Sequence, residues 1–433
     1  MNDALAALRQ DIQTALAQLA PPETTEPRAL GLMQGFPPRP EGLVLFERDQ
    51  LLAAPWNRWT FSHIRELMPT AQVWRGAQPP SALPAARAAT GLPHLDLAHI
   101  HYSDLFGRPA TVAQMVREAY TDGLLIVHRG HVVHEQYEGE LRPERPHLAM
   151  SVTKSIVGMV AAQLAHEGVL ALDQTAGHYV PELRDSAWAD ATLQQMLDMT
   201  VGVAYSEDYD NPQAQVWRHA YAGRMRPRPP GYAGPHGFYA SLATFRKQGE
   251  HGVDFDYKTV NTEALSWVLA RTTGLRTAEL LNQRLWQPMG AEHDADFMLD
   301  DHGVEAGGGG LCTTLRDLAR FGETMRCGGF FNGRQIIAPA VIDAVRRGGD
   351  RAQFARSPYT LIEGGSYRLQ WWLTHNAHGA YMARGIFGQS LYIDPHAELV
   401  VARYAAHPLA ASRYTDPLTL PGLHALALAL SAS

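Results

Sequence analysis

Lysine is the scarcest charged residue of this chain. The 433 residues include 37 lysines and arginines, and three of these are lysine: Lys154, Lys247 and Lys258. Arginine stays charged under all ordinary conditions, whereas a lysine removed from water can lose its proton and act as a base. A lysine inside an apolar segment of such an arginine-rich chain is therefore a candidate for acid–base chemistry.

Other features are also absent. Two cysteines, Cys312 and Cys327, are too few for a disulfide framework, and no zinc-type CxxC spacing lies near them. A net charge of −7 without long runs of one sign excludes the pattern of a nucleic-acid or anionic-membrane binder. No segment approaches the roughly 18 consecutive apolar residues of a membrane span. The polar, helix-periodic start is unlike a signal peptide, so we expect a cytoplasmic protein that binds neither nucleic acid nor membranes.

The order of the expected elements predicts an α/β protein of the α+β type. Strand-like runs lie near both ends of the chain and helical segments lie between them, which indicates one antiparallel sheet flanked by helices. Residues 1–95 are rich in proline and arginine, and we expect an extension packed on the body. We expect residues 96–180 and 296–433 to form the sheet domain, and residues 181–295 an all-α subdomain with a lid loop.

Three segments carry more detailed predictions. A helix is expected from near Ser151 to about His166, because a glycine follows as a stop signal. "NTEALSWVLARTTG" predicts a second helix, with Asn261 as its N-cap. "SYRLQWWLTH" predicts a strand, whose alternation places Trp371 and Trp372 on opposite faces, so that one lines a cleft while the other packs.

Ser151 and Lys154 lie at i and i+3 at the start of the first of these helices, within "AMSVTKSIVGMVAAQLA". This spacing places both side chains on one face, about 5–6 Å apart at Cβ. A serine hydroxyl is a weak nucleophile until a base takes its proton, which a neutral lysine can do. The helix N-terminus also favours developing negative charge. The alternative is a serine N-cap followed by a solvated lysine.

Two further segments supply candidate partners for the serine. Tyr257 in "FDYKTVN" precedes a helix, and a phenol beside a cation can have a lowered pKa and shuttle protons; the alternative is an aromatic residue at a strand end. Gly385 and Gly388 in "RGIFGQSLYIDP" indicate close approach of the backbone to a neighbour. An N–H group there, with that of the nucleophile, can form an oxyanion hole. The glycines equally permit a bulge.

Taken in this order, the motifs resemble those of the serine β-lactamase-like superfamily, over roughly residues 115–410. That superfamily includes class C β-lactamases, penicillin-binding DD-peptidases and related esterases. The likeness rests on "SVTK", "SEDYDNP", "YKTVNT", "LQWW" and "RGIFG", and it is strongest to the family of 6-aminohexanoate-dimer hydrolases. The resemblance implies a serine hydrolase that cleaves small-molecule amides or esters through an acyl-enzyme, with no cofactor and no metal. The resemblance is compatible with a homodimer.

The resemblance also implies roles for individual residues. Ser151 is the acylated nucleophile, Lys154 its general base, and Tyr257 the group that passes protons to the leaving group. The backbone N–H groups of Ser151 and Ile386 form the oxyanion hole. The implied substrate-binding residues are Tyr209, Asn261, Trp372, Gly385 and Phe387.

The chain departs from its relatives in two places. "ARGIFG" has no lysine at the position of the K-T-G motif, which predicts weak activity on β-lactam antibiotics. "QVWRHAYAGRM" has no acidic residue where the 6-aminohexanoate enzymes receive the amine of their substrate. A β-lactamase or DD-peptidase, and a non-catalytic penicillin-binding-like sensor, are the competing hypotheses. No residue is assigned as a separate base for deacylation.

Two remaining motifs are better explained by structure than by ligands. His128, His131 and His134 lie on a predicted hairpin without accompanying carboxylates, so we expect surface side chains and no metal. "EAGGGGLCT" at residues 305–313 could hold a phosphate, but we expect close packing near the cleft.

Overall fold

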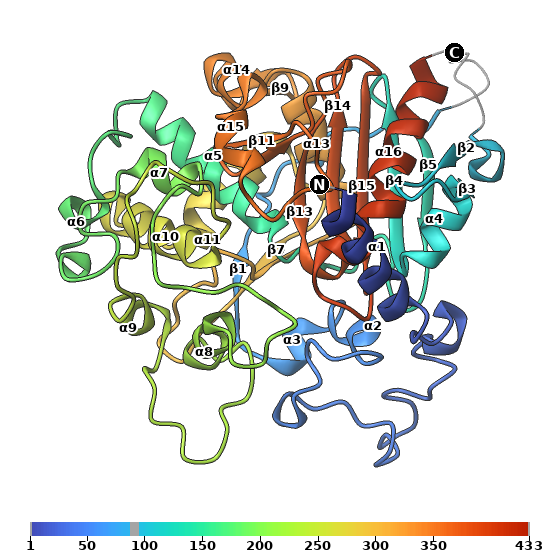
Figure 1. The fold of residues 1–433 in the computed structure, drawn as a ribbon, viewed down its shortest axis with the longest axis horizontal. Helices are drawn as coiled ribbons and strands as arrows, with labels where there is room; N and C mark the ends of the chain where they lie inside the picture. Colours follow the sequence, from blue (N-terminus) through green and yellow to red (C-terminus); the bar gives the residue numbers. More distant parts are fainter. Residues whose placement is uncertain (1, 87–94, 432–433) are drawn as a thin grey trace.

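A seven-stranded antiparallel sheet forms the centre of the computed structural model, which describes residues 2–86 and 95–431 (Figure 1). Its strand order is β11-β12-β13-β14-β15-β4-β5. The strands are β4 Thr121–His128, β5 His131–Tyr137, β11 Ser366–Arg368, β12 Trp371–Leu373, β13 Tyr381–Gly385, β14 Gln389–Asp394 and β15 Leu399–Ala405. Helices cover this sheet, which confirms the predicted antiparallel α/β fold. The end of the predicted N-terminal extension, residues 87–94, lies outside the described residues.

The sheet separates two apolar cores, because side chains alternate along its strands. In β4, Leu125 and Val127 face the core that contains α5 and α13, whereas Leu124 and Ile126 face the core with α4 and α16. Every residue of β4 and β15 is buried, as expected for central strands between two helical layers. The four helices are α4 Val112–Glu118, α5 Val152–His166, α13 Leu315–Arg326 and α16 Asp416–Ser431.

A group of helices, green to yellow in Figure 1, lies to one side of the sheet. The group comprises α6 Ala176–Tyr179, α7 Leu193–Leu197, α8 Gln215–Ala222, α9 Phe238–Leu242, α10 Thr259–Thr273, α11 Thr277–Leu281, a π-helical turn Asn282–Trp286 and α12 Gln287–Met289. Helix α10 is buried over most of its length and packs against α5, α6, α7 and α9. The boundaries of the helical subdomain, residues 181–295, stay a prediction.

A smaller sheet leads the chain into α5. Its order is β1-β7-β8-β6, with β1 Thr70–Val73, β6 His147–Leu148, β7 Ala295–Met298 and β8 Leu311–Thr313. After β6, the backbone N–H of Ala149 donates to the Leu311 carbonyl (2.8 Å), and the Leu311 N–H donates to Thr153 Oγ1 (3.2 Å). Met150 has a φ of 49°, so the chain turns sharply before Ser151. Leu311 of β8 thus holds the turn through Ala149, which precedes Ser151, and through Thr153, which follows it.

Several predicted elements are confirmed and two differ. The helix expected to start near Ser151 is α5, which ends at His166 as predicted. Strands β4 and β5 form the expected hairpin. "SYRLQWWLTH" is two strands, β11 and β12, because Leu369 and Gln370 adopt φ values of 49° and 70° and reverse the chain between them. Helix α10 begins at Thr259 with Lys258 as its N-cap, so the prediction of Asn261 as the N-cap is wrong.

The remaining elements border this body. Helix α1 Asn2–Leu16 agrees with the helical periodicity at the start of the sequence (Figure 1), and it contacts the short turn Ser412–Tyr414 that precedes α16. Among the residues described, no helix is long and apolar enough to cross a membrane. The other elements are α2 Asn57–Thr60, α3 Ile64–Leu67, β2 His101–Ser103, β3 Pro109–Thr111, β9 Phe330–Phe331, β10 Arg334–Gln335, α14 Pro339–Arg347 and α15 Arg351–Ala355.

Candidate active site

Ser151 and Lys154 meet at the first turn of α5. Ser151 occupies the N-cap position, yet its side chain makes no capping hydrogen bond. Its Oγ instead accepts a hydrogen bond from Lys154 Nζ at 2.7 Å, and the same Nζ donates to the carbonyl oxygen of Gly308 at 2.5 Å. Lys154 is 1% exposed, so the alternative of a capping serine beside a solvated lysine is wrong.

The surroundings of Lys154 favour its neutral form. Burial lowers the pKa of Lys154 to about 8, while the carboxylates of Glu207 and Glu263 act in the opposite direction. A general base is most effective when its pKa lies near the working pH. The amine that touches the serine hydroxyl therefore has the protonation behaviour that proton abstraction requires.

Glu263 of α10 supports the segment that receives Lys154. Its two carboxylate oxygens accept hydrogen bonds from the N–H groups of Gly307 (3.0 Å) and Gly308 (2.9 Å). Burial raises the pKa of Glu263 to about 7. A Cβ atom at Gly308 would lie 2.9 Å from the Glu263 carboxylate, and one at Gly307 would collide with Ser266. This confirms the close packing predicted for the glycine-rich segment.

Tyr257 lies against the same pair of residues. Its ring centroid is 5.2 Å from Lys154 Nζ, and its phenol takes part in a hydrogen bond with Ser151. Burial raises the pKa of Tyr257 well above its ordinary range, and the charge of Glu207 adds to this. The prediction of a lowered pKa is therefore wrong, because burial outweighs the cation. Tyr257 is a neutral phenol at rest, which suits a proton donor better than a base.

The end of β13 passes directly over the Ser151 turn. A Cβ atom at Gly385 would lie 3.0 Å from the backbone nitrogen of Ser151 and 2.9 Å from the Ala149 carbonyl oxygen. No side chain fits there, which confirms the close backbone approach predicted from the glycine. Ile386 follows Gly385 and lines the pocket together with Ser151. An oxyanion hole needs two backbone N–H groups close together, and the Ser151 nitrogen lies here beside the residue that precedes Ile386.

Two pockets meet at Ser151. The larger has a volume of about 620 Å³, and Tyr257, Trp372 and Gly385 contribute to its wall. Its charged lining residues are Glu207, Asp208, Asp210, Asp256, Asp416, Arg384 and Arg413. Three of the five carboxylates form ion pairs, Asp210 with Arg413, Asp416 with Arg384 and Asp256 with Lys258. Among the described residues, Glu207 and Asp208 are the pocket carboxylates without such a partner, and they leave the pocket with an excess of negative charge.

The smaller pocket has a volume of about 110 Å³ and is mostly apolar, with Trp217 and Phe238 in its lining. Two buried polar atoms interrupt the apolar lining, the Tyr205 hydroxyl and His219 Nε2. Neither atom has a hydrogen-bond partner within residues 2–86 and 95–431. Burial lowers the pKa of His219 to about 3, so its ring is neutral. The pocket suits a short apolar group that ends in a hydrogen-bonding atom.

Tyr209 lines both pockets, and its ring packs edge-on against Trp217. The Tyr209 hydroxyl donates a hydrogen bond to Glu207 Oε1 at 2.6 Å, and Thr259 Oγ1 donates to the same oxygen at 2.6 Å. Glu207 was not expected in the site, although it lies two residues before Tyr209 in "SEDYDNP". A carboxylate beside a candidate binding tyrosine was the available signal.

Trp372 lines the larger pocket, and its ring lies 5.1 Å from that of Tyr257. The guanidinium of Arg384 covers Trp372 at 5.0 Å and forms a buried ion pair with Asp416 of α16. Trp371 is fully buried on the opposite face, as the alternation predicts. Arg384 opens the motif "RGIFG", but the sequence assigns it no role.

Two expected substrate-binding residues do not reach the pocket. Phe387 has a φ of 61° and packs edge-on against Phe61, with ring centroids 5.3 Å apart. Asn261 is fully buried in α10, where its side-chain oxygen accepts a hydrogen bond from Trp188 Nε1 at 2.9 Å. Both side chains contribute to the core instead. Sequence proximity to Ile386 and Tyr257 does not show where a side chain points.

The hairpin histidines also differ in part from expectation. His128 is buried, and its Nδ1 lies 3.0 Å from the Ala397 carbonyl oxygen, so a surface position is wrong for this residue. His131 and His134 are half-buried. Over the part of the chain that the structure describes, these three residues do not form a metal-type cluster.

Comparisons with known proteins identify the class. The sequence profile of the family described as Beta-lactamase matches residues 110–418, so the chain belongs to the beta-lactamase family. The protein is a hydrolase of the serine β-lactamase type.

Within this family, the chain is similar to hydrolases of 6-aminohexanoate dimers. The 6-aminohexanoate-dimer hydrolase of Paenarthrobacter ureafaciens is 35% identical over 364 residues, which cover 83% of this chain and 88% of that protein. A solved structure of a proposed 6-aminohexanoate-dimer hydrolase from Bacillus anthracis has a TM-score of 0.80 at 28% identity, covering 89% of this chain and 97% of that one. EstCE1, a hydrolase with promiscuous acyltransferase activity, shares the fold at a TM-score of 0.55 and 16% identity, covering 72% and 98%.

Proposed function

We propose that this protein cleaves amide or ester bonds of small molecules through an acyl-enzyme on Ser151, with Lys154 as the base. One observation carries the proposal: a fully buried lysine donates a 2.7 Å hydrogen bond to the serine hydroxyl. Removal from water makes the neutral amine accessible, and the contact places it where the serine proton must go.

In acylation, the Ser151 oxygen attacks the substrate carbonyl while its proton passes to Lys154 Nζ. The carbonyl oxygen becomes an oxyanion that the N–H groups of Ser151 and Ile386 bind; both residues line the pocket where Gly385 packs on the Ser151 turn. Tyr257, a neutral phenol in contact with both Ser151 and Lys154, then gives its proton to the leaving amine or alcohol. The proton held on Lys154 restores the phenol, so the charges balance.

In deacylation, water enters the position that the leaving group has vacated. Tyr257 takes a proton from this water while its own proton passes to neutral Lys154, and the hydroxyl adds to the acyl carbonyl. Collapse of the second tetrahedral intermediate returns the proton to the Ser151 oxygen and releases the acid. The same three side chains serve both halves of the reaction, as microscopic reversibility allows.

The pocket chemistry supports linear substrates with a protonated amine. The larger pocket has an excess of carboxylates, and Glu207 and Asp208, which have no ion-pair partner among the described residues, supply the acidity that the segment 215–225 lacks. The named substrate of the Paenarthrobacter relative, a 6-aminohexanoate dimer, is a linear amide with an amine at one end. We therefore place ω-amino amides first among the amide substrates to be tried.

The catalytic assignment is tested by covalent labelling. A fluorophosphonate should label the wild-type protein once, at Ser151 by peptide mass spectrometry, and should not label Ser151→Ala. A wild-type protein that stays unlabelled while circular dichroism shows it folded would contradict the assignment and favour a non-catalytic binding protein.

The substrate class is tested by a small panel of compounds. It contains p-nitrophenyl esters, nitrocefin, the 6-aminohexanoate dimer and its N-acetylated form. We expect hydrolysis of the esters, weak activity on nitrocefin, and a kcat/KM for the free-amine dimer about tenfold or more above that for the acetylated one, because acetylation removes the charge that faces the carboxylates. Equal values for the two dimers would refute the role of the acidic wall, and rapid nitrocefin hydrolysis would favour a β-lactamase.

A further inference from the structure

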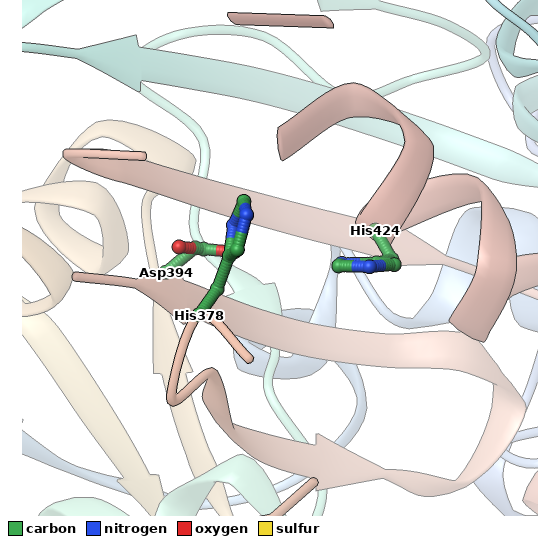
Figure 2. Close-up of side chains that lie close together, drawn as sticks. All are labelled: His378, Asp394 and His424. Carbon is green, nitrogen blue, oxygen red and sulfur yellow. The ribbon is translucent and has the colours of Figure 1, made fainter. Parts of the chain in front are cut away.

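A cluster of three side chains of metal-ligand type lies at the end of β13 opposite to Gly385. It consists of His378, Asp394 and His424, whose ligand atoms all lie within 4.8 Å of one another. His378 precedes β13, Asp394 ends β14 and His424 belongs to α16. Figure 2 shows His378 and Asp394 together at the sheet and the His424 ring pointing toward them from the helix. The proposed hydrolysis uses none of these residues.

The carboxylate of this cluster is held in one orientation. The Asp394 side chain is fully buried, and its Oδ2 lies 2.9 Å from His378 Nδ1. Its other oxygen, Oδ1, accepts a hydrogen bond from the backbone N–H of Ala397 at 2.9 Å. The Tyr392 hydroxyl donates a longer bond, 3.4 Å, to Oδ2. Hydrogen bonds that fix a ligating carboxylate in this way are typical of metal sites.

The two imidazoles are held close to that carboxylate. His424 is half-buried, and its Nδ1 lies 3.3 Å from the side-chain nitrogen of Asn376. The His378 ring lies between its neighbours, with centroids 5.3 Å from His424 and 4.5 Å from His396. The cluster is therefore assembled before any ion enters, with the histidine rings still accessible from solvent.

The donor set and the spacing point to one class of ion. Imidazole nitrogens with a carboxylate oxygen suit zinc and similar transition metals, whereas magnesium and calcium prefer oxygen donors. In a tetrahedral site, ligand atoms about 2.0–2.2 Å from the ion lie about 3.4 Å apart. The observed limit of 4.8 Å is wider by more than an ångström, so the two half-buried histidine side chains must rotate toward the ion when it binds.

We propose that His378, Asp394 and His424 bind one divalent transition-metal ion of the zinc class, with water in the fourth position. Such an ion joins α16 to the outer ends of β13 and β14. Its effect is on stability, because an ion that binds the folded chain alone stabilises it by mass action. It takes no part in the chemistry at Ser151, so failure of the proposed hydrolysis would leave this inference standing.

The test uses the full-length protein after EDTA treatment and removal of the chelator. Isothermal titration with ZnCl₂ near pH 7.5 should show one binding event, and MgCl₂ should show none. Zinc at one hundred times its Kd should raise the Tm by about 3–5 °C. The absence of a stoichiometric zinc event in the wild-type protein would overturn the proposal.

Variants locate the ion. His424→Asn and His378→Asn should each weaken zinc binding at least tenfold and abolish the Tm shift, while His396→Asn, a neighbouring histidine outside the set, should bind as the wild type does. Zinc binding that persists in His424→Asn belongs to other histidines and overturns the assignment, as does loss of binding in His396→Asn. Hydrolysis of a p-nitrophenyl ester should stay within about twofold of wild type in all three, which also shows that they are folded.

Discussion

Lys154 and Lys258 are both buried, at 1% and 6% exposure, yet their partners give them opposite roles. Lys258 donates to the Val203 carbonyl oxygen at 2.6 Å and forms an ion pair with Asp256 at 2.6 Å. Both hydrogen bonds of Lys154 go to neutral groups, a carbonyl and the Ser151 hydroxyl. A touching carboxylate holds an amine in its charged form. Burial therefore makes a lysine into a base only where no carboxylate touches it.

The strongest test of this difference exchanges each lysine for arginine. Lys154→Arg should lower kcat/KM for a p-nitrophenyl ester by about 10³-fold, close to the loss in Lys154→Ala, because arginine cannot give up its proton. Lys258→Arg is the matched control and should stay within about threefold of wild type. An active Lys154→Arg variant would remove Lys154 from the role of base.

The next largest effect is expected at Tyr257. Tyr257→Phe keeps the ring that packs on Trp372 and removes the hydroxyl that contacts Ser151. We expect kcat to fall by about 10²-fold with little change in KM, since a positioned proton donor acts in the transition state. The loss should be larger for an amide than for a p-nitrophenyl ester, whose leaving group needs no proton. Equal losses for both substrates would contradict the assignment as donor to the leaving group.

A smaller and more specific effect on activity is expected when the carboxylate of Glu263 is removed. The wild-type kcat/KM should rise with pH through the Lys154 pKa of about 8, because only the neutral amine accepts the serine proton. The Glu263 carboxylate raises that pKa. Glu263→Gln should therefore move the midpoint to lower pH, by about one unit. A pH–rate profile measured from pH 5 to 10 checks this, and a midpoint that stays or rises would refute the coupling.

The smallest effect on activity is expected at the other buried lysine. Lys258→Met leaves the Val203 carbonyl and Asp256 without their partner. We expect the free energy of unfolding to fall by about 1–3 kcal/mol, while kcat/KM per folded molecule stays within about threefold. Urea unfolding monitored by fluorescence measures the first quantity. A large loss of activity without loss of stability would show that Lys258, too, takes part in the reaction.

The parts that local sequence determines could be predicted. Ser151 and Lys154 could be paired because helical spacing alone places them on one face. Gly385 could be recognised because a glycine in an apolar strand indicates a backbone contact that leaves no room for a side chain. Strands and long helices follow from hydrophobic periodicity, so the antiparallel sheet and its helical layers were also within reach. The β11–β12 hairpin was not predicted, because it depends on two non-glycine residues with positive φ, which carry no sequence signal. The short strands of the smaller sheet, β1-β7-β8-β6, were not predicted either, and the sequence indicated one sheet only.

The parts that depend on tertiary contacts could not be predicted. Phe387 and Asn261 lie beside functional residues in the sequence, but their side chains point into the core. Glu263 reaches Lys154 through a glycine segment more than forty residues away. His378 and His424 come from different elements, and neither lies in a recognisable ligand motif. The raised pKa of Tyr257 depends on burial, which the sequence does not reveal.

The scarcity of lysine also determines how the protein responds to acylating reagents. Guanidinium groups do not react with activated esters under mild conditions, and two of the three lysines are buried. Lys247, exposed and paired with Asp190, is the lysine within reach of such reagents. Among the lysines, an amine-directed dye or resin should therefore attach at this one, far from the catalytic serine in the sequence, with the α-amino group of the chain as the competing amine.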